Sequence, residues 1–201
     1  MDYPFHTKKI GQIEPELLAA LQAAIAGLPY NPHPAFGGQT VMTNQQRTIP
    51  DALIQAVLKH LPQFPTANYN GYELNRLNAG QAIAEHSDVG SRAPGVAYAI
   101  AHRHKIHLVV DTNPDVLTWH RRSKDGEEYM QHMAAGGLYL YNDYIWHRVA
   151  NRGQTDRVHM LLSFWDRSWD IKEQLIDELR GGDRYELPAA HNIRRTYKAP
   201  E

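Results

Sequence analysis

Three residues of this 201-residue chain have the types and spacing of metal ligands. His86 and Asp88 lie two positions apart in AEHSDVG, residues 84–90, so an extended backbone would point both side chains to one face. His147 closes GGLYLYNDYIWHRV, which has the pattern of a strand–turn–strand unit, and could supply a third ligand. Two imidazoles and one carboxylate on one side of a metal leave open positions opposite, an arrangement that suits non-haem Fe(II) oxygen chemistry.

A second group of polar residues begins ten positions after His147. Arg157 opens the apolar stretch RVHMLLSFW, and a cation that enters a buried strand needs an anionic partner. A guanidinium offers two parallel donors to a carboxylate, either of the protein or of a small molecule. His159 faces the same side, and His107, in HKIHLVV, could donate a second hydrogen bond to such an anion.

Two helices and a series of short strands are expected to position these residues. Pro15 suits a first helical position, an apolar stripe follows, and Gly27 ends it; the stretch 48–62 repeats this pattern, with Pro62 as its stop. The stretch between them, NPHPAFGG, reads as a loop. A third helix is expected within SWDIKEQLIDELRGG, residues 168–182.

The strands follow from about residue 70. Short segments rich in branched and aromatic residues alternate with turn signals, which favours an antiparallel sandwich or barrel. The predicted fold class is therefore mainly β with flanking helices (α+β). We expect residues 1–201 to form one domain, with N-terminal helices and loops over 1–68, a β core over 70–166, and a C-terminal helix and tail over 168–201. The tyrosines of LYLYNDY are interpreted as ordinary strand residues.

Composition narrows the function classes. The absence of cysteine excludes disulfides, thiolate zinc sites and iron–sulfur clusters. A formal net charge of −1 implies no bulk attraction to nucleic acid or to an anionic membrane, so a nucleic-acid partner is not expected. We find no secretion signal and no apolar run long enough to cross a bilayer, and we expect a cytoplasmic protein without a membrane partner.

These features together resemble a known family. The order His86-x-Asp88, His107, His147, Arg157 is similar to that of the Fe(II)- and 2-oxoglutarate-dependent oxygenases, most closely the aspartyl/asparaginyl β-hydroxylase branch. The resemblance runs over about residues 72–166, through NRLNAGQAIAEHSD, HKIHLVV, GGLYLYNDYIWHRVANRG and DRVHMLLSFWD. It implies a double-stranded β-helix, or jelly-roll, core that uses Fe(II), 2-oxoglutarate and O2.

The resemblance also implies roles for individual residues. His86, Asp88 and His147 would bind iron. Arg157 would hold the distal carboxylate of 2-oxoglutarate, with His107 at the other end of the cosubstrate. Asn75 stands where the family often has a serine near the cosubstrate, and His159 is grouped with these cosubstrate residues.

The implied reaction is hydroxylation of an unactivated C–H bond, with release of succinate and CO2. The substrate would be amino-acid-like: an Asp, Asn or Pro side chain in a peptide or protein, or a free amino acid. Arg92 and Arg121 are candidate substrate contacts, although Arg121 also fits a solvated hairpin end. Asp88 departs from the animal enzymes, which lack this acid, and the segment between His86 and His107 looks longer than usual. Two alternatives remain open: a cupin-like metalloenzyme that uses no keto acid, and a non-catalytic jelly-roll binding module. The oligomeric state is not predicted.

Overall fold

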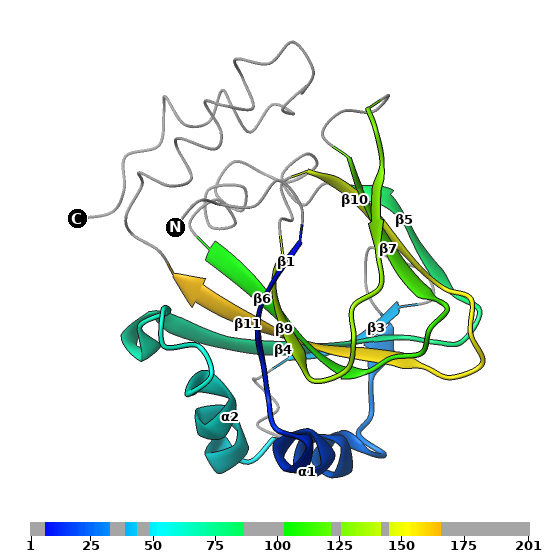
Figure 1. Ribbon diagram of the computed structural model, residues 1–201. Coiled ribbons are helices and arrows are strands. Elements are labelled where there is room, and N and C mark those ends of the chain that lie inside the picture. Colours follow the sequence, from blue (N-terminus) through cyan, green and yellow to red (C-terminus); the bar gives the residue numbers. More distant parts are fainter. Residues whose placement is uncertain are drawn as a thin grey trace, which may run out of the picture.

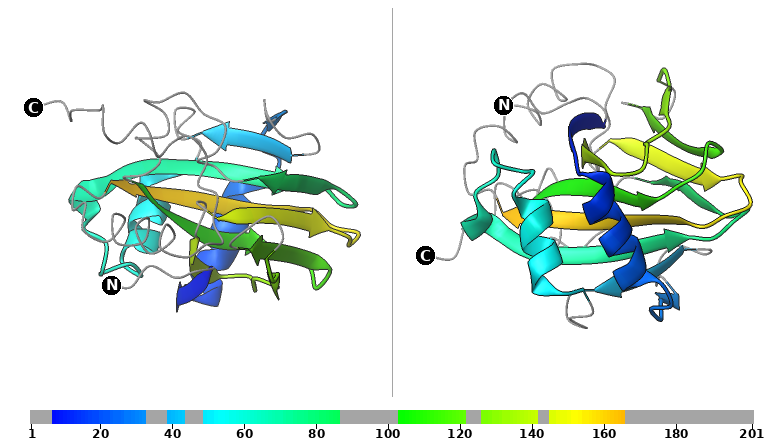
Figure 2. Two further views of the ribbon diagram at one scale, coloured as in Figure 1. Left: turned by 90° about the horizontal axis from the view of Figure 1, so that it is seen from above. Right: turned by 60° about the horizontal axis from the view of Figure 1, so that its bottom comes forward.

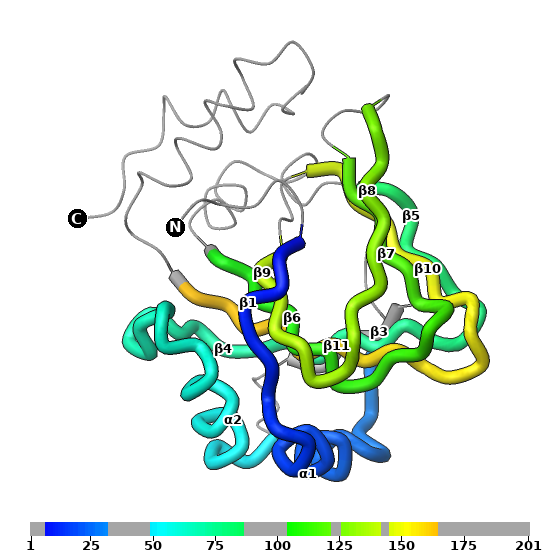
Figure 3. The backbone as a smooth tube through the Cα atoms, in the orientation of Figure 1, coloured from blue at the N-terminus to red at the C-terminus, as the bar shows by residue number. Residues whose placement is uncertain are grey.

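The strands form two antiparallel sheets, and both helices lie against the larger one (Figure 1). The computed structural model describes residues 7–32, 39–43, 49–86, 103–121, 126–141 and 145–165. Figure 3 follows the same path as a tube, on which the described ranges are coloured. Neither described helix has the length and apolar character needed to cross a membrane.

In the described ranges the larger sheet has seven strands. Their order is β1 (Lys8–Gln12), β9 (Gly137–Tyr141), β6 (Arg103–Asp111), β11 (Arg157–Trp165), β4 (Tyr69–Leu77), β3 (Gln39–Thr43) and β2 (Asn31–Pro32). The smaller sheet has four strands, in the order β5 (Ala82–His86), β10 (Trp146–Asn151), β7 (Val116–Arg121) and β8 (Tyr129–Gln131).

The helices cover one face of the seven-stranded sheet, as the second view of Figure 2 shows. They are α1 (Pro15–Ile25) and α2 (Asp51–Leu58), and a short 3-10 helix, Thr66–Asn68, leads into β4. Alternation along the strands then sorts the side chains into two sets. One set packs in the main core against helix residues such as Leu21 and Val57. It includes Leu74, Ile106, Leu108, Leu138, Met160 and Leu162.

The other set faces the smaller sheet and includes the polar residues singled out in the sequence. Where the two sheets meet, Leu77 of β4 packs with apolar side chains of β5, β7 and β10: Ile83, Val116 and Val149. Farther along the same face, the large sheet carries buried polar side chains: Asn75, His107, Arg157 and His159. The space between the sheets is thus apolar at one end and polar toward the other.

A buried asparagine ties the strand connections together at the apolar end. Asn151 Nδ2 lies 3.1 Å from the carbonyl oxygen of Leu77, 3.2 Å from that of Asn78 and 2.8 Å from that of Thr155. Its Oδ1 accepts from Asn113 Nδ2 at 3.0 Å. One side chain thereby links the turn after β4 to the turns after β6 and β10, so both sheets share a fixed end.

The predicted fold class is confirmed, with differences in detail. The N-terminal region expected to hold helices and loops also contributes β1, β2 and β3 to the large sheet. Asn31 and Pro32, which belong to the stretch interpreted as a loop, form β2. The C-terminal helix and tail expected over 168–201 lie outside the described residues.

Candidate metal and cosubstrate site

The imidazoles of His86 and His147 come together on neighbouring strands. The two residues are Cα partners in the β5–β10 pairing, and their ring centroids are 4.2 Å apart. The register explains why both rings share a face. Val149 pairs with Ile83, and His147 pairs with His86. The two pairs are two residues apart on β10 but three residues apart on β5, so β5 carries one extra residue at this point. Such a bulge reverses the alternation and turns the His86 side chain to the side of His147.

Local hydrogen bonds fix the same tautomer in both rings. His86 Nδ1 lies 2.8 Å from the carbonyl oxygen of Ala84, and His147 Nδ1 lies 2.9 Å from that of Ile145. A carbonyl oxygen only accepts, so each Nδ1 carries the proton and each neutral ring keeps its lone pair on Nε2. This is the usual way in which a protein orients a metal-binding histidine. The rings of His86 and His147 can therefore each bind a metal through Nε2.

The guanidinium of Arg157 is buried in the same inter-sheet space. The residue is 4% exposed, and burial lowers its pKa to about 10, so it stays charged at neutral pH. Within the described ranges no carboxylate lies within ion-pair distance of it. Its Nε and Asn75 Oδ1 are both buried without a hydrogen-bond partner in those ranges. A buried cation of this kind is a site for an anionic ligand.

Two buried histidines adjoin Arg157. Arg157 Nη2 lies 2.8 Å from His159 Nδ1, and the Nδ1 atoms of His107 and His159 are 3.2 Å apart. Burial and the neighbouring Arg157 charge hold the pKa of His159 well below its usual value, so its ring is neutral. Asn75 is the Cα partner of His159 on β4, which brings it to the same group.

Tyr141 lies between the residues around Arg157 and the histidine pair on β5 and β10. Its ring stacks on His107, with centroids 4.1 Å apart and planes inclined by 4°, and meets the His147 ring edge-on at 5.3 Å. The sequence interpretation treated this tyrosine as an ordinary strand residue. Its alternation with the core residues Leu138 and Leu140 was the available signal that it faces the other way.

His120 is a further buried residue of this region that was not predicted. It is the Cα partner of His147 on β7, its ring centroid lies 6.1 Å from that of His147, and its Nε2 lies 3.0 Å from Thr7 Oγ1. No sequence signal pointed to His120, because it lies in a strand, VLTWH, with no recognisable metal-binding spacing.

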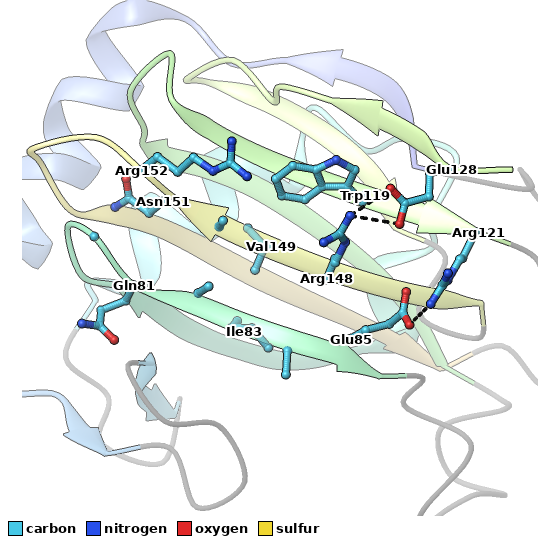
Figure 4. A pocket seen from close by; sticks show the side chains of 14 residues that line it. Gln81, Ile83, Glu85, Trp119, Arg121, Glu128, Arg148, Val149, Asn151 and Arg152 are labelled. Atoms are coloured by element: carbon cyan, nitrogen blue, oxygen red, sulfur yellow. Dashed lines mark hydrogen bonds and ion pairs between the residues drawn. The ribbon is translucent and has the colours of Figure 1, made fainter. Parts of the chain in front are cut away.

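Three predicted site residues are not brought together here. Asp88 and Arg92 lie outside the described residues. In the ranges that are described, no group of three His, Cys, Asp or Glu side chains is arranged to hold a metal ion, and of the three predicted ligands the two histidines are described. Arg121 is described, but its position does not fit a substrate contact beside the metal. It follows His120 on β7 and therefore points to the outer face of the small sheet, where it pairs with Glu85 (Figure 4).

The outer face on which Arg121 lies has its own shallow pocket of about 640 Å³. Trp119 lies between two arginines there, with the guanidinium carbons of Arg148 and Arg152 at 4.7 and 5.6 Å from its ring centroid. Arg148 is itself paired with Glu128 (Figure 4). None of the histidines of the candidate site lines this pocket, nor does Asn75, Tyr141 or Arg157, so the pocket is separate from that site.

The family comparison agrees with this geometry. Residues 36–167 match the model of the aspartyl/asparaginyl beta-hydroxylase family, a range that contains every described residue of the candidate site apart from Thr7. A comparison with curated proteins finds no match.

Solved structures with the same fold come from several bacteria. HygX from Streptomyces hygroscopicus, solved with nickel, 2-oxoglutarate and hygromycin B, has a TM-score of 0.59 at 11% identity and covers 81% of this chain and 84% of its own. A prolyl-4-hydroxylase from Pseudomonas putida has a TM-score of 0.50 at 16% identity, with coverages of 81% and 94%. A 2OG-Fe(II) oxygenase family protein from Burkholderia pseudomallei has a TM-score of 0.56 at 13% identity, with coverages of 76% and 80%. At these identities the likeness shows the fold, while the family match covers well over half of the chain. The chain therefore belongs to the aspartyl/asparaginyl beta-hydroxylase family.

Proposed function

We propose that this protein is an Fe(II)- and 2-oxoglutarate-dependent dioxygenase that hydroxylates an unactivated C–H bond of an amino-acid-like substrate. The observation that carries the proposal is the buried charge of Arg157, which has no carboxylate partner in the described chain and shares the inter-sheet space with His86 and His147. The facing sheets thus carry side chains suited to both halves of an oxygenase site: two imidazoles for a metal and a buried cation for a dianionic cosubstrate.

The donor set fits the metal. Imidazole Nε2 atoms suit Fe(II), and the absence of cysteine leaves only nitrogen and oxygen ligands. His86 and His147 would bind the iron, with Asp88 as the third ligand. This assignment of Asp88 rests on its place two residues after His86 and on the family resemblance.

The residues of the large sheet fit the cosubstrate. The Arg157 guanidinium would bind the distal carboxylate of 2-oxoglutarate, with Asn75 and His159 beside it and His107 on the side of the metal-binding pair. Burial removes competing water and strengthens this charge-assisted contact. The Tyr141 ring contacts both His107 and His147, and so would help to hold these two rings in place beside the cosubstrate.

When bound, iron and 2-oxoglutarate supply the oxidising power: O2 is consumed, the keto acid is released as succinate and CO2, and the substrate gains a hydroxyl group. The protein has to hold the target carbon near the metal and keep bulk water out. Family membership favours an Asp, Asn or Pro side chain of a peptide or protein, or a free amino acid, as the substrate. Arg92, which follows the metal-binding stretch, is a candidate contact for it.

The proposal is tested by anaerobic calorimetry followed by a turnover screen. The wild-type protein should bind one Fe(II) ion and then one 2-oxoglutarate. On admission of O2, peptides containing Asp, Asn or Pro and free amino acids are screened for succinate formation above the substrate-free rate. Binding of iron without 2-oxoglutarate would favour a cupin-like metalloenzyme, and binding of neither would favour a non-catalytic module.

A further inference from the structure

We propose that His159 is a positioning residue that orients both Arg157 and His107 by accepting a hydrogen bond from each of them through its single Nδ1 atom. This inference rests on the proposed function, because it concerns how the cosubstrate-binding residues are held. It differs from the family resemblance, in which His159 is simply one of several residues beside the cosubstrate.

The proton positions follow from Arg157. A guanidinium has donors only, so the 2.8 Å contact from Arg157 Nη2 requires a lone pair on His159 Nδ1. His159 is neutral, and its proton must then be on Nε2. The 3.2 Å contact between the two Nδ1 atoms consequently requires that His107 Nδ1 carries a proton and donates it toward His159. One charged donor thus determines the tautomers of two buried rings.

The surroundings keep His159 in this state. The residue is fully buried, and the groups that influence its charge are Arg157, His107 and His132. Burial first, and then all three of these groups, disfavour the charged ring, and no carboxylate in the described ranges opposes them. A protonated His159 would lose both contacts and place a second cation against the guanidinium.

The arrangement has a direct consequence for the cosubstrate. Arg157 is held from one side by His159, so its remaining donors, including the buried Nε, stay aimed in one direction. His107 uses its Nδ1 proton toward His159, and the stacked Tyr141 ring fixes its plane. We had expected His107 to donate a hydrogen bond to the anion; in this tautomer the Nδ1 proton is already engaged.

Two substitutions separate positioning from simple filling of space. His159→Asn places a carbonyl oxygen close to the position of Nδ1 and keeps the acceptor. His159→Phe keeps the ring but removes the acceptor. The first readout uses no cosubstrate: nitrogen-15 chemical shifts of the metal-free protein report which ring nitrogens carry protons. We expect a bare Nδ1 on His159 and a protonated Nδ1 on His107 in the wild type. A protonated His159 Nδ1 would overturn the inference.

The second readout is calorimetric binding of 2-oxoglutarate to the Mn(II)-loaded protein. We expect His159→Phe to weaken 2-oxoglutarate binding by about 10- to 100-fold, the equivalent of one hydrogen bond to a charged group, and His159→Asn to stay within about threefold of the wild type. The Mn(II) affinity should be unchanged in both variants, which a general loss of structure would not allow.

The outcomes distinguish this inference from the proposed function. If the wild type binds 2-oxoglutarate and His159→Phe binds it equally well, the positioning role is wrong and the proposed function stands. If the Mn(II)-loaded wild type does not bind 2-oxoglutarate at all, the proposed function fails and this inference fails with it. If His159→Asn is as weak as His159→Phe, the acceptor is not the property that matters, and the inference is again overturned.

Discussion

Replacing Arg157 by methionine should change protein stability and cosubstrate binding in different ways. Methionine approximates the length of the arginine side chain but carries no charge. Arg157 is 4% exposed, and burial lowers its pKa from the usual guanidinium value to about 10. At about 1.4 kcal/mol per pKa unit, keeping this charge buried costs the folded protein about 3 kcal/mol at neutral pH.

The hydrogen bond to His159 offsets part of that cost. A hydrogen bond to a charged group contributes about 1.5–3 kcal/mol, so the two effects nearly cancel. We therefore expect Arg157→Met to leave the free energy of unfolding of the metal-free protein within about 2 kcal/mol of the wild type. We expect the change to be a gain in stability rather than a loss. Truncation of an ordinary buried side chain would instead destabilise the protein.

Arg157→Met should strongly weaken the binding of 2-oxoglutarate. Loss of one partner of a buried, charge-assisted pair costs about 3–5 kcal/mol, which corresponds to a roughly 100- to 4,000-fold weaker affinity for 2-oxoglutarate. Urea unfolding of the metal-free protein measures the first effect, and urea unfolding of the Mn(II)-loaded protein with and without 2-oxoglutarate measures the second. At 100 times its dissociation constant, 2-oxoglutarate should stabilise the wild type by about 2.7 kcal/mol, and at the same concentration it should hardly stabilise the variant.

Two further variants complete this experiment. Arg157→Lys keeps the charge but loses the forked donor geometry, and should lie between methionine and wild type in 2-oxoglutarate affinity. Arg152→Met removes an exposed arginine of the outer face and should match the wild type in both measurements. The reasoning is refuted if Arg157→Met unfolds with a loss above 3 kcal/mol while 2-oxoglutarate still stabilises it as much as the wild type.

Three other predictions test separate parts of the structure. His147→Ala should lower Mn(II) affinity by roughly 100-fold or more while the circular dichroism spectrum stays unchanged; an unfolded variant would indicate a structural role instead. Asn151→Ala should reduce the free energy of unfolding by about 3 kcal/mol in urea, because it leaves buried carbonyls of two turns without donors, and a loss below 1 kcal/mol would contradict this role. His159 stays neutral in the folded protein, whereas the unfolded chain takes up a proton below pH 6.5. Proton uptake by His159 in the unfolded chain should therefore lower the free energy of unfolding by up to about 1.4 kcal/mol for each pH unit below 6.5. The free energy of unfolding of His159→Asn should lack this part of the pH dependence.

The sequence predicted the framework of the site because its strands are strongly patterned. RVHMLLSFW alternates polar and apolar residues at its beginning, so the placement of Arg157 and His159 on one face followed from the period of two. The helix over residues 15–25 was equally clear from Pro15 at its start and the glycine beyond its end.

Other features depend on tertiary pairing and left no local signal. The strands β1 and β3 form because β9 and β4 offer free edges to them, and neither segment has a distinctive pattern of its own. The position of Arg121 depends on the register between β7 and β10, which sends it to the outer face together with Arg148. The sequence alone therefore could not tell which side of the sheet this residue lies on.

The extra residue in β5 has a consequence for comparing relatives of this protein. If β5 kept its length but paired regularly, without the bulge, Glu85 would lie opposite His147 and the His86 imidazole would turn to the outer face, although the letters His-x-Asp would be intact. An alignment that scores only the ligand letters cannot detect this change. The strand pairing just before the pair is thus as diagnostic of a working centre as the pair itself.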